Sequence, residues 1–246
     1  MRARRVAAIY DVHGNLPALE AVLAEVEREQ PDVVVFGGDM AAGWYPVEVL
    51  ARLRQVPNAR FVAGNCERVM VQIYDGELEG QFELTDAAAR KISRADRDFM
   101  AAFEPTVEIE IDGLGPVLFC HATPHSDEDL VTPLTPIAEA EQLLAGAPPI
   151  VVYGHIHVQG DTRMGRHRLV NAGSVGIPYG STAACWALLG PDITLRQTHY
   201  DLDRAVPQLA SAPDWDGSHE WAERLLRPPT AADALAQHEK NRRAHR

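Results

Sequence analysis

Short apolar runs alternate with amphipathic segments along the first third of the chain. The pattern predicts, in order, a strand at 6–10, a helix at 17–29, a strand at 32–36, a helix at 47–56 and a strand at 60–63. Pro17 stands at the start of the first helix, where apolar residues then recur at three- and four-residue spacing. Strands and helices that alternate at this spacing are typical of a sheet with parallel strands.

The second half of the chain has a different pattern, in which strands follow one another directly. Residues 85–103 form a charged amphipathic stretch that predicts one helix with Thr85 as its N-cap, covering part of the sheet or of a site. Two runs around an Asp-Gly turn predict a β-hairpin. The predicted elements of this half are the hairpin strands 106–111 and 117–120, a helix at 137–144, an apolar strand from 150, a strand at 168–171 and a pair at 183–189 and 193–200.

From Asp201 onward, proline-rich turns separate short predicted helices that contain Trp215, Trp221 and Leu225. We therefore predict two parts, a main domain of mixed α/β class at 1–200 and a helical extension at 201–246. The extension would pack on the domain or form an oligomer contact, so a homo-oligomer is one of the two alternatives.

Charge and cysteine content exclude several classes of partner. The chain has 23 Lys and Arg against 35 Asp and Glu, a net charge of −12. This balance argues against non-specific binding of duplex nucleic acid and against a basic membrane-docking surface. Three widely spaced cysteines indicate no disulfide framework, and no apolar run is long enough for a membrane span or a signal peptide. We therefore expect a cytoplasmic protein without a membrane contact.

Polar residues that can bind metal follow most of the predicted strands. In the stretch 150–157 an apolar run ends in a glycine and then in His155 and His157, whose side chains point the same way on an extended backbone. By itself this pair is equally typical of a metal site and of a surface loop. The strand ends together contribute Asp11, His13, Asp39, Asn65, His121, His155 and His157. Such a mixture suits Mn, Fe, Co or Zn ions, and seven ligands fit two ions that share a carboxylate.

The order of these residues is similar to that of a known family. The blocks Asp-x-His, Gly-Asp, Gly-Asn-(His/Cys)-(Asp/Glu), a single His and Gly-His-x-His occur in sequence between 11 and 157. The chain resembles the calcineurin-like metallophosphoesterase superfamily, and in particular its small prokaryotic phosphodiesterases. The resemblance fades beyond about residue 200. It implies a four-layer αββα sandwich, in which two packed β-sheets are flanked by helices, and assigns residues 1–200 as the metallophosphoesterase catalytic domain.

The resemblance also implies roles for the seven residues. Asp11, His13 and His157 would hold one divalent ion, Asn65, His121 and His155 a second, and Asp39 would bridge both. The ions would be Mn, Fe, Co, Zn or Ni. A hydroxide shared by the two ions would attack phosphorus in line. Asp39, Asn65 and His121 are therefore the expected catalytic residues, with Asn65 also orienting a phosphoryl oxygen.

One position departs from the branch of the family that has Gly-Asn-His. Cys66 stands where a histidine stabilises or protonates the leaving group in that branch. A thiol with a pKa of about 8.5 is a poor proton donor to an alkoxide. We therefore predict a preference for good leaving groups, such as nucleotide diesters or a phosphoanhydride, and slow turnover of alkyl monoesters. The alternative is that Cys66 is only a small packed residue.

Four further residues are candidate substrate contacts, and each has a plainer alternative. Asn15 could bind phosphate or stabilise its turn, and Trp44 could stack on a base or pack under its loop. Arg68, placed in the turn after Asn65, could meet a phosphate or be solvated. His125 could reach the substrate or lie exposed in its loop.

These observations predict a phosphodiesterase with two divalent ions per chain that acts on a small phosphate ester, with a nucleotide as the expected substrate. One alternative is a dinucleoside-polyphosphate (Ap4A-type) hydrolase. Another is a catalytically silent scaffold of the same fold that binds proteins, which would be expected to lack some of the ligands.

Overall fold

Two mixed β-sheets form the centre of the molecule. The structure is a computed structural model that describes residues 1–80, 83–212 and 215–244. In order across the first sheet stand β1 (Arg2–Ala3), β5 (Thr106–Ile111), β6 (Gly115–Cys120), β7 (Ile150–Tyr153), β9 (His167–Asn171) and β8 (Gly160–Met164). In order across the second stand β11 (Ile193–Thr198), β10 (Ala184–Leu189), β2 (Val6–Ile9), β3 (Val33–Phe36) and β4 (Ala59–Phe61).

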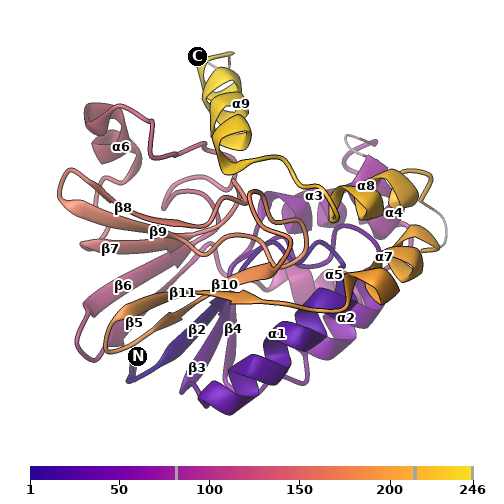
Figure 1. Ribbon diagram of the computed structural model, residues 1–246, viewed down its shortest axis with the longest axis horizontal. Coiled ribbons are helices and arrows are strands. Elements are labelled where there is room, and N and C mark those ends of the chain that lie inside the picture. Colours follow the sequence, from indigo (N-terminus) through magenta and orange to yellow (C-terminus); the bar gives the residue numbers. More distant parts are fainter. Residues whose placement is uncertain (81–82, 213–214, 245–246) are drawn as a thin grey trace.

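Helices cover the outer face of each sheet (Figure 1). The helices are α1 (Leu16–Glu29), α2 (Pro46–Leu53), α3 (Asn65–Tyr74), α4 (Glu83–Ala89), α5 (Arg94–Ala101), α6 (Ile137–Leu143), α7 (Leu202–Ala210), α8 (Ser218–Arg224) and α9 (Ala231–Ala244). Helices α1 to α5 pack on the five-stranded sheet, whereas α6 and α9 pack on the six-stranded one.

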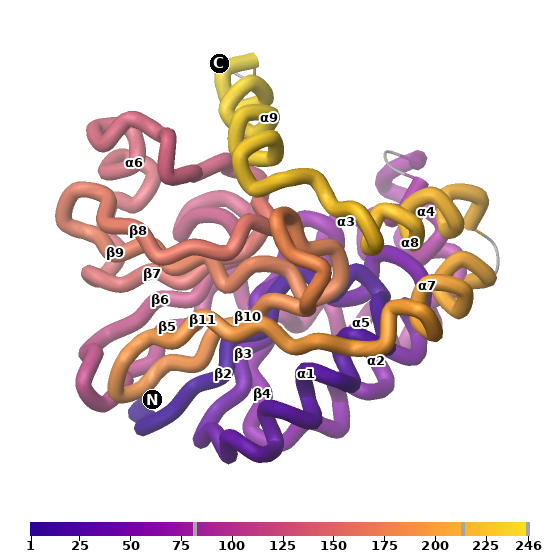
Figure 2. Tube along the Cα trace, in the orientation of Figure 1, coloured from indigo at the N-terminus to yellow at the C-terminus, as the bar shows by residue number. Residues whose placement is uncertain are grey.

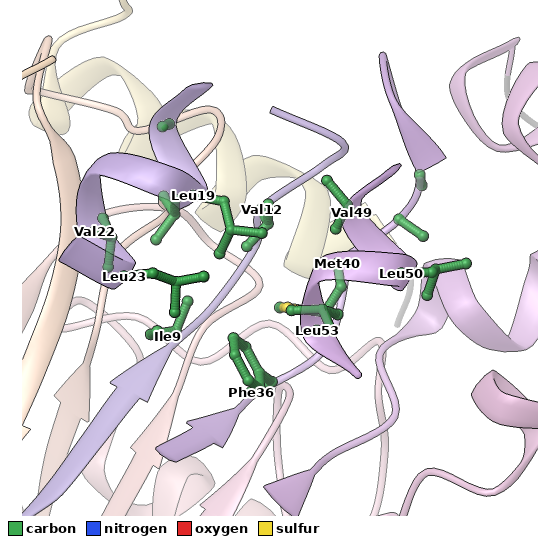
Figure 3. Packing of buried hydrophobic residues seen from close by; sticks show 14 of the residues in the cluster. Ile9, Val12, Leu19, Val22, Leu23, Phe36, Met40, Val49, Leu50 and Leu53 are labelled. Carbon is green, nitrogen blue, oxygen red and sulfur yellow. The ribbon is translucent and has the colours of Figure 1, made fainter. Parts of the chain in front are cut away.

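The alternation of side chains along the strands creates these layers. In β2, Val6 and Ala8 point into the apolar cluster between the sheets, while Ala7 and Ile9 point toward the helices. Since successive side chains of a strand face opposite sides, an apolar run of this kind can be buried on both faces. Figure 3 shows Ile9 and Phe36 against side chains of α1 and α2. The predicted four-layer αββα sandwich is confirmed.

One helix prediction was wrong in its extent. The stretch 85–103 forms two helices, α4 and α5, and Thr85 lies buried inside the first of them. The side chain of Ser93 accepts a hydrogen bond from the backbone N–H of Asp96 and so begins a new helix. A serine that bonds the backbone locally favours a helix start over a helix interior.

Helix α3 and strand β8 are among the elements that were not predicted. Residues 65–74 form α3, so Arg68 stands on a helix and not in a turn. Strand β8 pairs antiparallel with β9 at the edge of the six-stranded sheet.

The C-terminal helices pack on the rest of the chain. Helices α7 and α8 form an apolar cluster with Trp44 and Ile177, to which Trp215 also belongs. Helix α9 contributes Ala234 to the cluster on the outer face of the six-stranded sheet. The chain trace in Figure 2 shows this final segment, in orange to yellow, running across one side of the molecule. The domain division at residue 200 and the oligomer contact stay predictions. None of the described helices combines the length and apolar character that a bilayer crossing requires.

Candidate metal centre

The seven predicted ligands lie where strands of both sheets end. Asp11 and His13 follow β2, Asp39 follows β3, Asn65 begins α3 after β4, His121 follows β6, and His155 and His157 follow β7. Strands β2, β3 and β4 are parallel neighbours in one sheet, as are β6 and β7 in the other. The carboxyl ends of parallel strands meet at one edge, so five separate loops supply side chains to the same region.

The backbone is strained at most of these positions. Among the described residues, seven non-glycine residues have a positive φ, and five of them are Asp11 (52°), His13 (47°), Asp39 (57°), His155 (63°) and His157 (57°). Such conformations cost about 1–3 kcal/mol each and persist where the surrounding structure enforces them. Strained residues of this kind typically concentrate at functional sites, so their position at the strand ends indicates a functional site.

Two groups of ligand atoms share Asp39. The Nε2 atom of His157 lies 3.4 Å from Oδ1 of Asp11, and that of His13 lies 3.9 Å from the same oxygen. Oδ2 of Asp39 lies 3.8 Å from Nε2 of His13 and 3.6 Å from Nε2 of His121. Asp39 therefore stands between the two groups, which is the place that a bridging carboxylate would occupy.

The remaining two candidates lie beside His121. Its Nε2 atom is 3.1 Å from Oδ1 of Asn65, and its ring centroid is 5.0 Å from that of His155. The backbone N–H of His155 donates to Oδ2 of Asp11 at 2.9 Å, which ties this loop to the first group. The structure thus brings all seven residues together, while their role as ligands stays a prediction.

Backbone carbonyl groups fix the orientation of three imidazole rings. The pairs are His13 Nδ1 with Ala42 O at 3.2 Å, His121 Nδ1 with Gly37 O at 3.0 Å, and His157 Nδ1 with Ile177 O at 2.8 Å. A carbonyl oxygen only accepts, so the Nδ1–H of each ring donates. In a neutral ring the Nε2 atom then carries a lone pair, and all three Nε2 atoms point into the site. A hydrogen bond from the second ring nitrogen is the usual support of a metal-binding histidine.

When the rings are neutral, electron-pair acceptors face one another in this buried site. The Nε2 atoms of His13 and His157 are only 3.1 Å apart. Oδ1 of Asp11 is buried and has no hydrogen-bond partner in the described part of the chain. Buried oxygen atoms without a donor are rare and costly. A cation between these atoms would satisfy all of them, so the residues fit divalent metal ions.

The pKa shifts of these groups differ between the histidines. Burial would lower the pKa of His121 and of His157, but Asp39 beside the first and Asp11 beside the second outweigh it and raise both pKa values. Burial lowers the pKa of His13 to about 4, with a further contribution from the neighbouring His157. Burial also lowers the pKa of His155 to about 4, helped by His121. Burial would raise the pKa of Asp39, but His121 and His13 outweigh it and hold this pKa below its usual value. At neutral pH the carboxylate of Asp39 is therefore ionised, and the imidazoles of His13 and His155 are neutral. These are the forms that bind a metal ion.

Glu67 is a site residue that the sequence reasoning missed. Its buried carboxylate accepts hydrogen bonds from the backbone N–H groups of Asp39 and Met40, both at 2.7 Å, and of Gly64 at 3.0 Å. It therefore fixes the loop that contains Asp39 against the start of α3. The signal was present, because the third motif block ends in an acidic residue two positions after Asn65.

Two glycines leave room for the carboxylates. A Cβ atom on Gly64 would lie 2.2 Å from Oδ1 of Asp39, and one on Gly154 would lie 2.3 Å from Oδ2 of Asp11. Both contacts are closer than van der Waals distance, so these positions require glycine for the carboxylates to stay where they are.

Cys66 contacts Asp39, the predicted bridging residue, and its Sγ atom also accepts from the side-chain amide of Asn65 at 3.8 Å. Its buried Sγ atom donates to Oδ2 of Asp39 at 3.0 Å, and its backbone N–H donates to Oδ1 at 2.9 Å. Burial and the charge of Asp39 raise the pKa of this thiol well above its usual value. Cys66 therefore stays protonated and supports Asp39.

Two of the predicted substrate contacts need correction, because both side chains are buried and used elsewhere. Asn15 accepts from the backbone N–H of Ala18 at the start of α1 and donates to Gly176 O. Trp44 donates from Nε1 to Ser218 O and packs against Trp215, with ring centroids 5.4 Å apart. Neither side chain is available to a substrate in this structure.

The other two predicted contacts border one cavity. Arg68 and His125 line a cavity of about 500 Å³ that also touches His121. Arg68 pairs with Asp127 and Glu128, which connects α3 to the loop after β6. His125 Nε2 donates to Ala145 O at 2.9 Å. A contact of either residue with substrate stays a prediction.

Comparison with known proteins places this geometry in a family. The sequence profile of the calcineurin-like phosphoesterase superfamily domain matches residues 5–192. A metallophosphoesterase structure from Sphaerobacter thermophilus has a TM-score of 0.71 and 23% identity, over 91% of this chain and 98% of its own. A hypothetical protein from Pyrococcus horikoshii OT3 has a TM-score of 0.74 and 18% identity, over 89% and 97%.

A candidate diadenosine tetraphosphatase has a TM-score of 0.52 and 18% identity, over 79% of this chain and 94% of its own. At these identities the structures show a shared fold. No curated protein sequence matches the chain. The match to the family profile covers most of the chain and includes all seven residues of the centre. The chain belongs to the calcineurin-like phosphoesterase superfamily and is a metal-dependent phosphoesterase.

Proposed function

We propose that this protein is a phosphodiesterase that binds two divalent ions and hydrolyses small phosphate esters, with nucleotide diesters as the favoured substrates. The observation that carries the proposal is the set of facing acceptors around Oδ2 of Asp39. The 3.1 Å approach of Nε2 of His13 to Nε2 of His157, beside the unpartnered Oδ1 of Asp11, calls for a cation on that side. The 3.1 Å approach of His121 to Asn65 does the same on the other side.

The residues fall into two sets, which we name by their burial. The closed half consists of Asp11, His13 and His157, and would hold one ion. The open half consists of Asn65, His121 and His155, and would hold the other, with Asp39 shared. When bound, two such ions supply positive charge for a phosphate and activate water as a nucleophile at neutral pH.

The protein's own residues decide where a phosphate can enter. All three residues of the closed half are buried, whereas Asn65 and His155 are partly exposed. A phosphate would therefore approach from the side of Asn65 and His155. The amide of Asn65 would orient one phosphoryl oxygen there, while Glu67 keeps Asp39 in place from the opposite side.

The choice of ester follows from Cys66. Its thiol donates to Asp39, is buried, and has a raised pKa, so it is not placed to protonate a departing alkoxide. General acid catalysis by a positioned group typically contributes about 10²–10⁴-fold. Esters whose leaving groups need no proton would therefore be preferred. The cavity beside His121, which Arg68 and His125 line, is of a size typical for small-molecule sites and would take the leaving group.

The test compares bis-p-nitrophenyl phosphate with p-nitrophenyl phosphate. Protein stripped with a chelator and then supplied with Mn²⁺ is expected to hydrolyse the diester and to leave the monoester almost unchanged. Both activities should be absent before Mn²⁺ is restored. Faster turnover of the monoester than of the diester would contradict the proposal.

A second candidate is hydrolysis of a dinucleoside polyphosphate. The same Cys66 geometry favours it, because the leaving group of a phosphoanhydride is itself a phosphate. One of the similar structures is a candidate diadenosine tetraphosphatase. Turnover of diadenosine tetraphosphate, without turnover of either nitrophenyl ester, would favour this candidate.

The scaffold alternative is less well supported. It predicts a loss of ligands, yet all seven residues are present and six of them lie within 4 Å of another ligand atom.

A further inference from the structure

The loop at 154–158, which carries His155 and His157, is contacted by a helix from outside the matched family domain. The Nε2 atom of His238 on α9 lies 3.1 Å from the carbonyl oxygen of Ile156. A carbonyl oxygen only accepts, so the Nε2–H of His238 donates this bond. The contact therefore falls on the residue between the two histidines of the metal centre.

This loop needs support because of its backbone conformation. His155 and His157 both have a positive φ, at 63° and 57°. Residues held in this region keep it only when several contacts enforce it. On one side, the backbone N–H of Tyr179 donates to the carbonyl oxygen of His157 at 3.0 Å. On the other side, the bond from His238 holds the carbonyl group of Ile156.

Side chains also connect α9 to the loop at 154–158. Ile156 is buried in the cluster that includes Ala234 of α9. The ring centroid of Tyr179 lies 5.2 Å from that of His157 and 6.3 Å from that of His238. The helix is therefore connected to the loop by a hydrogen bond, by a shared apolar cluster and by an intervening aromatic ring.

Helix α9 is itself fixed next to His238. The buried carboxylate of Glu239 accepts from Oγ1 of Thr132 at 2.6 Å and from Oγ1 of Thr135 at 3.2 Å. Arg242, also buried, pairs with Glu239 at 2.6 Å and with Glu139 of α6. Buried ion pairs with further hydrogen bonds fix geometry, since breaking one leaves an uncompensated charge. In Figure 1, α9 stands on the same side of the molecule as α6.

We propose that His238 is a positioning residue for the metal centre, which holds the Ile156 carbonyl group so that His155 and His157 turn toward the ions. The inference rests on the proposed metal centre. It assigns a role to the C-terminal extension, because His238 lies beyond residue 192, where the family match ends.

The test measures Mn²⁺ affinity, not activity. Three variants of the full chain are compared with the unchanged protein by calorimetry, at one temperature below all unfolding transitions. His238→Ala removes the donor, His238→Gln keeps an N–H donor, and Lys240→Ala alters an exposed position of the same helix as the control. Residues that hydrogen-bond to metal ligands typically contribute about 10–100-fold to the affinity for the metal. We expect His238→Ala to weaken Mn²⁺ binding by about tenfold, while His238→Gln recovers most of the loss and Lys240→Ala changes nothing.

Unchanged Mn²⁺ affinity in His238→Ala, even with a lower melting temperature, would overturn the inference. Helix α9 would then stabilise the fold by packing and have no role in positioning the metal centre. An equal loss in His238→Ala and His238→Gln would overturn it as well, because the hydrogen bond would not be the cause. If the unchanged protein binds two Mn²⁺ ions but cleaves no diester, the proposed function fails while the affinity comparison still decides the role of His238.

Discussion

The closed half and the open half of the centre are built from similar residues but differ in how firmly the chain holds them. In the closed half, both imidazoles donate to backbone carbonyl groups and all three side chains are buried. In the open half, only His121 is held in this way, and Asn65 and His155 are partly exposed. The difference suggests a division of labour, in which the closed half retains its ion and the open half admits substrate.

The largest expected effect is on the residue that both halves share. Asp39→Ala removes the oxygen that faces both His13 and His121, so neither half keeps its full set of ligands. We expect the variant to lose the second ion and diester hydrolysis to fall about 10³-fold or more, because a paired-ion mechanism needs both ions in place. Metal analysis and initial rates are the measurements. Asp203→Ala, at an exposed position of α7, removes an equal charge and serves as the control. A variant that still held two ions would refute the bridging assignment.

The next prediction separates the two halves. His13→Ala should release the more tightly bound ion, whereas His155→Ala should leave one ion bound with nearly unchanged affinity. The reason is that the three side chains of the closed half are buried, and that the hydrogen bonds from its imidazoles to backbone carbonyl groups do not involve the side chain of His155. Competition with a chelator measures both affinities, and we expect them to differ by about tenfold or more, since even outer partners of ligands contribute 10–100-fold. The reverse order of effects would show that the open half holds its ion more firmly.

A smaller effect is expected at Cys66, which borders the open half. Cys66→His would introduce a proton donor beside Asp39 and should raise the rate for poor leaving groups by about tenfold, with less change for good ones. Rates on alkyl and nitrophenyl diesters measure the difference. Cys66→Ser keeps a donor to Asp39 and serves as the matched control. An equal gain on both classes of ester would remove the argument from the leaving group.

The smallest effect concerns the cavity next to the open half. Arg68→Ala should raise KM for a nucleotide diester by about three- to tenfold and leave KM for bis-p-nitrophenyl phosphate unchanged, since one charged contact of an exposed arginine contributes about 1 kcal/mol. Arg94→Ala serves as the control. It removes an exposed arginine that pairs with Asp98 on the surface of α5 and does not line the cavity. A rise in KM for both substrates would place Arg68 at the phosphate and not at the leaving group.

The sequence predicted the buried strands and the seven residues that converge at the strand ends, because both are local patterns. In the predicted strand 32–36, the four residues after Asp32 are all apolar and became β3, buried on both faces. The five motif blocks stand directly after strands, so that the parallel pairing of β2, β3 and β4 brings three of them together. Neither inference required knowledge of distant contacts.

The errors arose where distant contacts decide. Asn15 donates to Gly176, and Trp44 to Ser218, so their partners are more than 150 positions away. Both are buried, so the structure favours the plainer of the two alternatives for each residue. Strand β8 has the polar sequence Gly160–Met164 at a sheet edge, where neither face gives an apolar alternation. His238 was missed because nothing in an isolated helical pattern marks the loop that it contacts.

The number of Mn²⁺ ions that one chain binds tests the paired metal centre most directly. Equilibrium dialysis of chelator-stripped protein against Mn²⁺ gives this number without reference to any substrate. A paired centre should bind two ions per chain in two steps of different affinity, and His13→Ala should lose the tighter one. Saturation at one ion, or no binding at all, would contradict a paired centre built around Asp39.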